Sequence, residues 1–147
     1  DLAEPLFPGA REAIERLAAR GDLMLGIATG KSQRGLRLAL EQHDLARYFA
    51  TLQTADDAPS KPHPMMLERA MAEAGTGPRD TVLIGDTSYD IHMACAAGTH
   101  AFGVDWGYHP GHSLARAGAS VVLSDFAELH PALETIWTPS PTGEIVT

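Results

Sequence analysis

Two aspartates four residues apart have the clearest chemical potential in this sequence. Asp86 follows the apolar run Val82-Leu83-Ile84 and Gly85, and Asp90 falls where the first turn of a helix is expected. An uninterrupted apolar run is typical of a strand buried on both faces. Open α/β sheets place their ligands at the carboxyl ends of such strands. Two close carboxylates repel each other, so a metal cation or a basic side chain is expected between them.

A plainer interpretation of the same pattern is a capped turn between a strand and a helix. Gly85 permits an unusual backbone turn, and Ser88 is a candidate N-cap for the helix that follows. One of the two acids would then stabilise the helix N-terminus through the helix dipole. The spacing of the two aspartates is compatible with both interpretations.

Two further segments supply groups that bind anions. Thr29 and Gly30 follow the short apolar run 23–28, and a hydroxyl with backbone N–H groups before a helix is a natural anion cradle. The same segment is also typical of an ordinary N-cap. Lys61 stands between a serine and a proline and offers a point positive charge that could bind an anion. The plainer interpretation of Lys61 is a solvated surface lysine. Together with Asp86 and Asp90, these groups are the set that phosphoryl transfer and a bound Mg²⁺ require.

The apolar pattern along the chain predicts strands that alternate with helices. Strands are expected at 23–28, 49–54, 82–84, 100–104 and 121–123, and helices at 10–18, 36–43, 64–74, 91–98, 113–117 and 126–137, the last broken at Pro131. This alternation indicates an α/β fold with a three-layer, doubly wound parallel sheet. Residues 1–137 are expected to form one domain. Residues 138–147 lack an apolar stripe and are expected to be a loose C-terminal tail.

Length, charge and cysteine content narrow the classes of function. A chain of 147 residues is long enough for one domain with a normal core. The net charge of −8, without a Lys/Arg cluster, argues against nucleic acid or an anionic membrane surface as a partner. Cys95 is the sole cysteine, which excludes an internal disulfide and suits the cytoplasm; its place on an apolar helical stripe predicts burial. His109 and His112 lack a third ligand at matching spacing and are expected in a plain loop.

The order of these motifs resembles the haloacid dehalogenase (HAD) superfamily of hydrolases, in particular its phosphoglycolate phosphatase-like group. The resemblance runs from about Leu6 to Leu133. It rests on the segments Leu6-Phe7-Pro8-Gly9, Ile27-Ala28-Thr29-Gly30-Lys31, Ser60-Lys61-Pro62-His63-Pro64, Ile84-Gly85-Asp86-Thr87-Ser88-Tyr89-Asp90 and 103–109.

The resemblance implies a role for each matching residue. Thr29 would hydrogen-bond a phosphoryl group, and Gly30 would offer its backbone N–H. Lys61 would neutralise the phosphoryl oxygens and the nucleophile, so Thr29 and Lys61 are the catalytic candidates of this chain. Asp86 would ligate Mg²⁺, and Asp90 would complete the metal site or orient Lys61. The implied substrate is a small phosphate monoester.

One departure from the family pattern matters most. Family members begin with a strand that ends in Asp-x-Asp, whose first aspartate attacks phosphorus and whose second is the general acid/base. That motif is absent, since the candidates Asp1, Asp22, Asp105 and Asp125 are each followed two positions later by a residue other than aspartate. The sequence therefore resembles a member that lacks its first strand, its nucleophile and its cap.

The missing strand has a structural consequence. In the family it lies between the strands that carry Thr29 and Asp86, so its removal would leave a gap of roughly 9–10 Å lined by unpaired backbone groups. We therefore expect that a partner segment or a second chain completes the sheet, or that the sheet closes.

Two alternatives to a phosphatase core remain open. The first is a non-catalytic fragment or pseudoenzyme that keeps the fold as a binding module, which the absent Asp-x-Asp favours. The second is a signalling receiver domain, which also combines Asp, Thr and Lys on a doubly wound sheet. In receivers the acidic pair comes first and the lysine last, whereas here Thr29 comes first and the acidic pair last.

Overall fold

The apolar runs of the sequence form the strands of one sheet in the computed structural model, which describes residues 9–56, 58–107, 109–136 and, for the backbone, 143–146. The opening segment at Leu6, the loop residues Asp57 and Tyr108, the helix end at Trp137 and most of the predicted tail lie outside these ranges. The strands are β1 (Leu23–Ala28), β2 (Phe49–Gln53), β3 (Thr81–Gly85), β4 (His100–Val104), β5 (Val121–Leu123) and β6 (Gly143–Val146).

The helices also form where the amphipathic stripes predict them. They are α1 (Ala10–Ala18), α2 (Gln33–His43), α3 (Met65–Ala74), α4 (Ser88–Ala97), α5 (Gly111–Ala117) and α6 (Leu129–Ile136), with 3₁₀ turns at Ala46–Tyr48, Pro78–Asp80 and Phe126–Glu128. α3 begins directly after Pro64, whose fixed φ suits a helix start. Each of α3 and α4 ends at a glycine in the left-handed conformation, Gly75 and Gly98.

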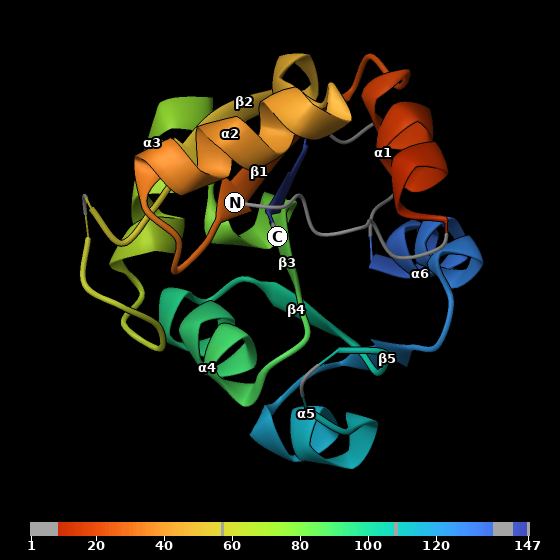
Figure 1. Cartoon of the computed structure of the whole chain (residues 1–147). Helices are drawn as coiled ribbons and strands as arrows, with labels where there is room; N and C mark the ends of the chain where they lie inside the picture. The colour runs from red at the N-terminus through yellow and green to blue at the C-terminus, as the bar shows by residue number, and fades with distance from the viewer. Residues whose placement is uncertain (1–8, 57, 108, 137–142, 147) are drawn as a thin grey trace.

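The sheet has the strand order β2-β1-β6-β3-β4-β5, and all of its pairings are parallel (Figure 1). The chain winds in one direction from β1 to β2 and in the other from β3 to β5. The order therefore reverses between β1 and β3, and the carboxyl ends of these two strands meet at this switch point. In doubly wound sheets this is the position where ligands bind.

Two apolar layers hold the helices against the sheet. On one face, α3, α4 and α5 pack Leu67, Ile91 and Leu114 against residues such as Leu83 of β3. On the other face, α1 and α6 pack Leu17, Leu129 and Leu133 against alternate residues of the strands, and α2 continues this layer over β1. The three-layer α/β architecture predicted from the sequence is confirmed.

The expectation of a loose C-terminal tail is wrong for residues 143–146. These residues form β6, which lies between β1 and β3 (Figure 1). β6 pairs with residues 23–26 on one side and with residues 81–83 on the other. The reason is the slot itself: two strand edges with unpaired backbone groups stabilise an extended segment that has little strand signal of its own.

The predicted gap in the sheet is therefore neither open nor closed by contact between β1 and β3. A segment from the far end of the same chain fills part of it, so the described residues contain a six-stranded sheet without the first strand of the family pattern. β6 contributes Gly143, Glu144, Ile145 and Val146 and carries no Asp-x-Asp.

Two smaller expectations also need correction. Pro131 does not break the last helix: the 3₁₀ turn gives way to α6 at Leu129, and Pro131 lies in the first turn, where backbone N–H groups have no partner within the helix. Cys95 is exposed rather than buried, with its Sγ near the backbone of α5. No described helix is both long enough and apolar enough to cross a lipid bilayer.

A cluster of charged side chains lies where the carboxyl end of α1 approaches the first turns of α6. His130 is partly buried, and burial together with the positive charges of Arg16 and Arg20 lowers the pKa of its imidazole, although Glu134 and Asp22 act in the opposite direction. The Arg20 guanidinium donates two hydrogen bonds to Asp22 at 3.0 and 2.7 Å, and this contact lowers the pKa of the Asp22 carboxyl.

Candidate functional site at the sheet switch point

Thr29 lies at the carboxyl end of β1, where the strand gives way to the loop before α2. Its backbone N–H donates to the carbonyl of Gln53 in β2, at 3.0 Å. Its Oγ1 accepts a hydrogen bond from the backbone N–H of Lys31 at 3.2 Å. The N-cap of α2 is Ser32, whose side chain accepts from Gly35, so Thr29 is not the capping residue.

Asp86 and Asp90 lie at the carboxyl end of β3, on either side of the start of α4. The N-cap is Thr87 rather than Ser88. The Thr87 hydroxyl accepts from the N–H of Asp90, while Asp90 Oδ2 accepts from the N–H of Thr87 at 3.1 Å. This reciprocal pair is a capping box, which satisfies two backbone donors that a helix start leaves without partners. The capped-turn interpretation of the sequence is therefore correct for Asp90.

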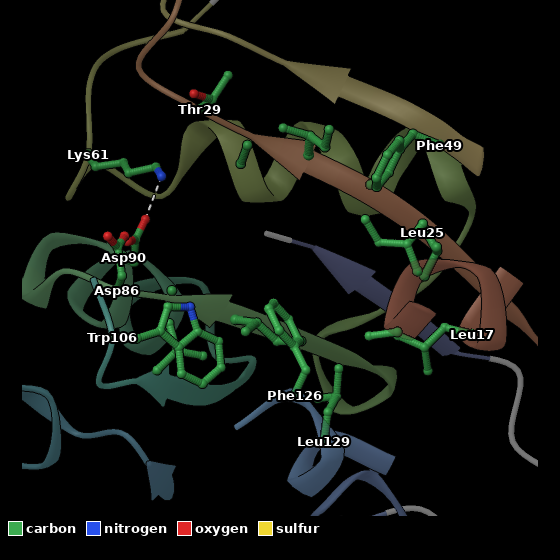
Figure 2. Close-up of a pocket in the computed structure, with 18 residues that line it drawn as sticks. Leu17, Leu25, Thr29, Phe49, Lys61, Asp86, Asp90, Trp106, Phe126 and Leu129 are labelled. Carbon is green, nitrogen blue, oxygen red and sulfur yellow. Dashed lines mark hydrogen bonds and ion pairs between the residues drawn. The ribbon is translucent and has the colours of Figure 1, made fainter. Parts of the chain in front are cut away.

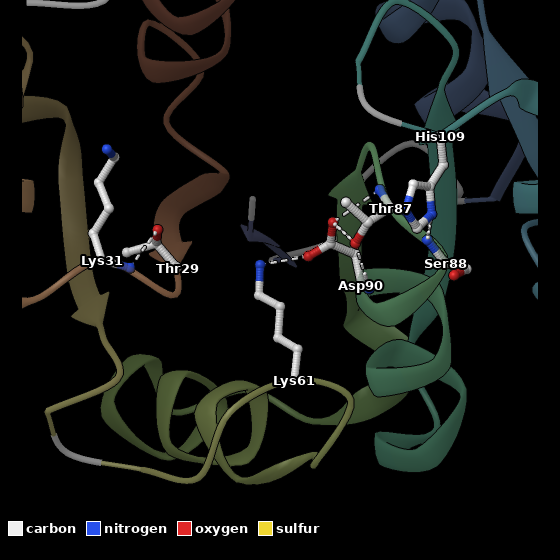
Figure 3. Close-up of polar contacts among 7 residues, drawn as sticks. All are labelled: Thr29, Lys31, Lys61, Thr87, Ser88, Asp90 and His109. Atoms are coloured by element: carbon white, nitrogen blue, oxygen red, sulfur yellow. Dashed lines mark hydrogen bonds and ion pairs between the residues drawn. The ribbon is translucent and has the colours of Figure 1, made fainter.

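The second oxygen of Asp90 makes a different contact. Asp90 Oδ1 accepts a hydrogen bond from the Lys61 ammonium, so that Lys61 and Asp90 form an ion pair (Figure 3). The Asp90 side chain is 5% exposed and that of Lys61 20% exposed. Figure 3 shows the Lys61 side chain reaching from its loop between Thr29 and Asp90. A basic side chain does stand beside the acidic pair.

Two glycines allow the two carboxylates to lie close to the backbone. A Cβ placed on Gly85 would lie 2.3 Å from the Cβ of Asp90, and a Cβ on Gly107 would lie 2.3 Å from the Cβ and the Oδ2 of Asp86. Gly85 does not adopt a positive φ. Its function is therefore to permit this close approach, and the predicted unusual turn is wrong.

The loop after β4 is hydrogen-bonded to the start of α4. The backbone N–H of His109 donates to the carbonyl of Asp86 at 3.1 Å, and Nδ1 of His109 accepts from the N–H of Ser88 at 2.9 Å. The His109 ring also lies against that of Tyr89, with 5.7 Å between the ring centroids. His109 therefore lies in a loop, as expected, and packs against the segment that presents Asp86, whereas His112 lies in α5 and not in the loop.

These groups share one cavity of about 380 Å³ between β1 and β3 (Figure 2). Thr29, Lys61, Asp86 and Asp90 lie at its polar end. The rest of its lining is apolar and comes from α1, the strands β1 to β4, the start of α6 and the segments after β4 and β5. It includes Leu17, Leu25, Phe49, Trp106, Phe126 and Leu129. The cavity thus joins a charged end to an apolar channel.

Sequence reasoning found the charged groups but missed three residues that hold them. Thr87 carried a usable signal, because threonine three residues before an acid is the pattern of a capping box. Gly107 and His109 carried none, since their contacts with Asp86 and Ser88 join segments about 20 residues apart.

The donor set at the polar end fits one part of a metal site. The carboxylate of Asp86 is of the oxygen type that Mg²⁺ prefers, and Mg²⁺ commonly takes one or two carboxylates with water and phosphate oxygens completing the shell. Asp90 already accepts from Thr87 and Lys61. Within the described part of the chain, no three His, Cys, Asp or Glu side chains gather closely enough to enclose an ion.

Comparison with known proteins assigns the chain to the family that the sequence motifs resemble. The profile of the haloacid dehalogenase-like hydrolase family matches residues 3–104. A phosphoglycolate phosphatase from Salmonella paratyphi A is 35% identical over 129 residues, which cover 87% of this chain and 51% of the relative. The chain therefore spans about half the length of that relative.

Solved structures of similar architecture agree. A predicted phosphoglycolate phosphatase from Haemophilus somnus superposes with a TM-score of 0.80 at 25% identity, over 88% of this chain and 57% of that one. A HAD family hydrolase from Deinococcus radiodurans, solved with bound phosphate and sodium, superposes with a TM-score of 0.76 at 27% identity, over 90% of this chain and 62% of that one.

Proposed function

The chain belongs to the haloacid dehalogenase-like hydrolases, and from that premise we propose that it supplies the phosphate- and metal-binding half of a Mg²⁺-dependent phosphate monoester hydrolase. The substrate is a small phosphorylated metabolite, for which phosphoglycolate is the first candidate because similar proteins are phosphoglycolate phosphatases. The observation that carries the proposal is the Lys61–Asp90 ion pair, at the polar end of a cavity that Thr29 and Asp86 also line.

The proposed roles follow from the contacts of each side chain. Thr29 donates its hydroxyl proton to a phosphoryl oxygen, since its Oγ1 already accepts from Lys31 and its proton is available for donation. The backbone N–H of Gly30 binds a second oxygen. Lys61 neutralises the charge that develops on the transferring group, and Asp90 orients the ammonium.

Asp86 is the proposed metal ligand of this chain, because both oxygens of Asp90 accept hydrogen bonds from other residues. When bound, Mg²⁺ would neutralise phosphoryl oxygens and help to align the phosphate for in-line attack. Gly107 leaves room for the Asp86 carboxylate, and His109 holds the Asp86 backbone.

The nucleophile is the missing component. We propose that an Asp-x-Asp strand outside these 147 residues, on the same polypeptide or on a partner, completes the reaction, and that this chain alone is inactive. The non-catalytic alternative has one observation in its favour, since β6 occupies part of the position that such a strand would take.

The test separates binding from turnover. The chain should bind inorganic phosphate in the presence of Mg²⁺, measured by calorimetry, and Lys61→Gln should weaken that binding at least tenfold. Lys31→Gln is the matched control, because Lys31 is an exposed lysine near the same anion cradle that does not line the cavity. Equal phosphate affinity in the wild type and Lys61→Gln would contradict the assignment.

A second arm tests the activity itself. The chain should not hydrolyse p-nitrophenyl phosphate with Mg²⁺, whereas a fusion that adds an N-terminal Asp-x-Asp strand should. Phosphate binding without turnover in the fusion would favour the binding-module alternative.

A further inference from the structure

The outer face of α2 carries three exposed side chains in one stripe. Leu36 and Leu40 hold α2 against β1 and β2, and Figure 1 shows this helix on the outside of the molecule. The helical repeat of 3.6 residues places Leu38 on the opposite side from these two buried residues. Leu38 is 43% exposed. Arg34 and Glu41, one turn before it and one turn after it, are exposed on the same face.

The two charges of this stripe are placed against the helix dipole. The first turn of α2 carries Arg34 and no acidic residue, and Glu41 lies in the last turn. A helix favours negative side chains at its N-terminus and positive ones at its C-terminus, so each charge lies at the less favourable end. Arg34 and Glu41 are too far apart to pair along one helix, and neither belongs to an ion pair among the described residues. These charges therefore contribute little to the stability of α2 within one chain.

The same stripe is complementary to a copy of itself. Arg34 and Glu41 are about two helical turns apart, and Leu38 lies close to the midpoint between them. If two α2 helices run antiparallel about a two-fold axis at that midpoint, Arg34 of each copy faces Glu41 of the other, and the two Leu38 side chains meet at the axis. A two-fold interface requires this kind of self-complementary patch. A parallel pair would instead bring like charges together.

We infer that this face of α2, formed by Arg34, Leu38 and Glu41, binds a second copy of the chain in an antiparallel two-fold dimer. The antiparallel arrangement also places the N-terminus of each helix near the C-terminus of the other, which the helix dipoles favour. One helix face buries less than the roughly 1,200 Å² of a standard interface, and each chain carries a net charge of −8. The dimer is therefore weak and reversible. This inference does not depend on the proposed function, and its test involves no turnover.

Sedimentation equilibrium of the full chain, at about 0.01–1 mM, measures the dimer. The wild type should dimerise reversibly, and Arg34→Glu should weaken the dimer at least tenfold because it places carboxylates opposite each other. Arg69→Glu makes the same change of charge at an exposed position of α3 and should leave the dimer unchanged. Arg34→Glu adds an acid to the first turn of α2, so its free energy of unfolding in urea should not fall. A wild type that stays monomeric throughout, or equal weakening by both variants, would overturn the inference.

Two further arms test the pairing itself. Glu41→Arg should also weaken the dimer at least tenfold, but an equimolar mixture of Glu41→Arg and Arg34→Glu should dimerise again, because one stripe then carries two carboxylates and the other two guanidinium groups. Leu38→Gln keeps a good helix former but removes the apolar centre and should weaken the dimer, whereas Met24→Gln, at another exposed apolar position, should not. A dimer that persists in Arg34→Glu and Leu38→Gln, or a mixture that stays monomeric, would show that the two stripes do not meet and overturn the inference.

Discussion

The contact between Gly107 and Asp86 predicts a sharp effect of a single methyl group. In Gly107→Ala the new Cβ would lie 2.3 Å from the Cβ and Oδ2 of Asp86 and 2.7 Å from its Cγ. Non-bonded carbons pack at about 3.5–4.0 Å, so the Asp86 side chain or the loop must move by more than about 1 Å. Metal ligands tolerate displacements of only about 0.2 Å. The substitution should therefore displace the proposed Mg²⁺ ligand.

Two measurements quantify this effect. The free energy of unfolding in urea should fall by about 1–3 kcal/mol, the usual cost of overpacking. The Mg²⁺ affinity, followed by the fluorescence of Trp106 in the same cavity, should fall about 10–100-fold, as it does when the support of a metal ligand is lost. Gly77→Ala is the control, because no atom lies within 4 Å of its Cβ position and its φ of −114° suits alanine.

The result that would refute this reasoning is specific. If Gly107→Ala lost stability but bound Mg²⁺ as tightly as the wild type and Gly77→Ala, Asp86 would not be the ligand. If neither the stability nor the Mg²⁺ affinity changed, the loop at Gly107 would be free to move away from Asp86. The close contact would then not be needed to position the Asp86 carboxylate.

Two further predictions concern charges. Asp90→Asn keeps an acceptor for the helix cap but removes the negative charge that pairs with Lys61. The free energy of unfolding in urea should fall by about 3 kcal/mol. This is the low end for a broken buried pair, because part of the Lys61 side chain is exposed to solvent. Asp44→Asn, in an exposed pair, should cost at most about 1 kcal/mol, and similar losses in both would contradict the prediction. Because the pKa of His130 is lowered in the fold, the unfolded chain binds its proton more tightly, so the free energy of unfolding should decrease as pH falls through the ordinary histidine range. His130→Gln should flatten that dependence in urea titrations at several pH values, and an unchanged slope would exclude His130 as its source.

Strands and helices were predictable where burial imposes a period on the sequence. Residues 81–85 are all buried, and the three in the middle are apolar without interruption. Helices such as α2 instead bury residues at a helical spacing, with exposed residues between them. Two helix starts differed from the prediction: α4 is capped by Thr87 instead of Ser88, and α6 begins at Leu129 instead of residue 126. Both depend on hydrogen bonds whose geometry the sequence pattern does not specify. β6 was missed for another reason: its four residues carry little pattern, and its conformation is set by the strands on either side.

The polar residues of the site were predictable, but their supports were not. Thr29, Asp86 and Asp90 stand out by type and by their place after apolar runs, and Lys61 by its place between a serine and a proline; all four line one cavity. The contact of Gly107 with Asp86 depends on how two loops pack together. A glycine that is needed for close approach looks in sequence like any loop glycine.

The capped turn and the metal site were alternatives in the sequence. The contacts of Asp90 confirm the capped turn, and the metal site stays a proposal centred on Asp86. Asp90 Oδ2 serves the helix cap and Oδ1 holds Lys61, so its charge is already balanced by a cation. A divalent cation placed beside Asp90 would be repelled by the Lys61 ammonium, which is the reason for proposing Asp86 as the Mg²⁺ ligand.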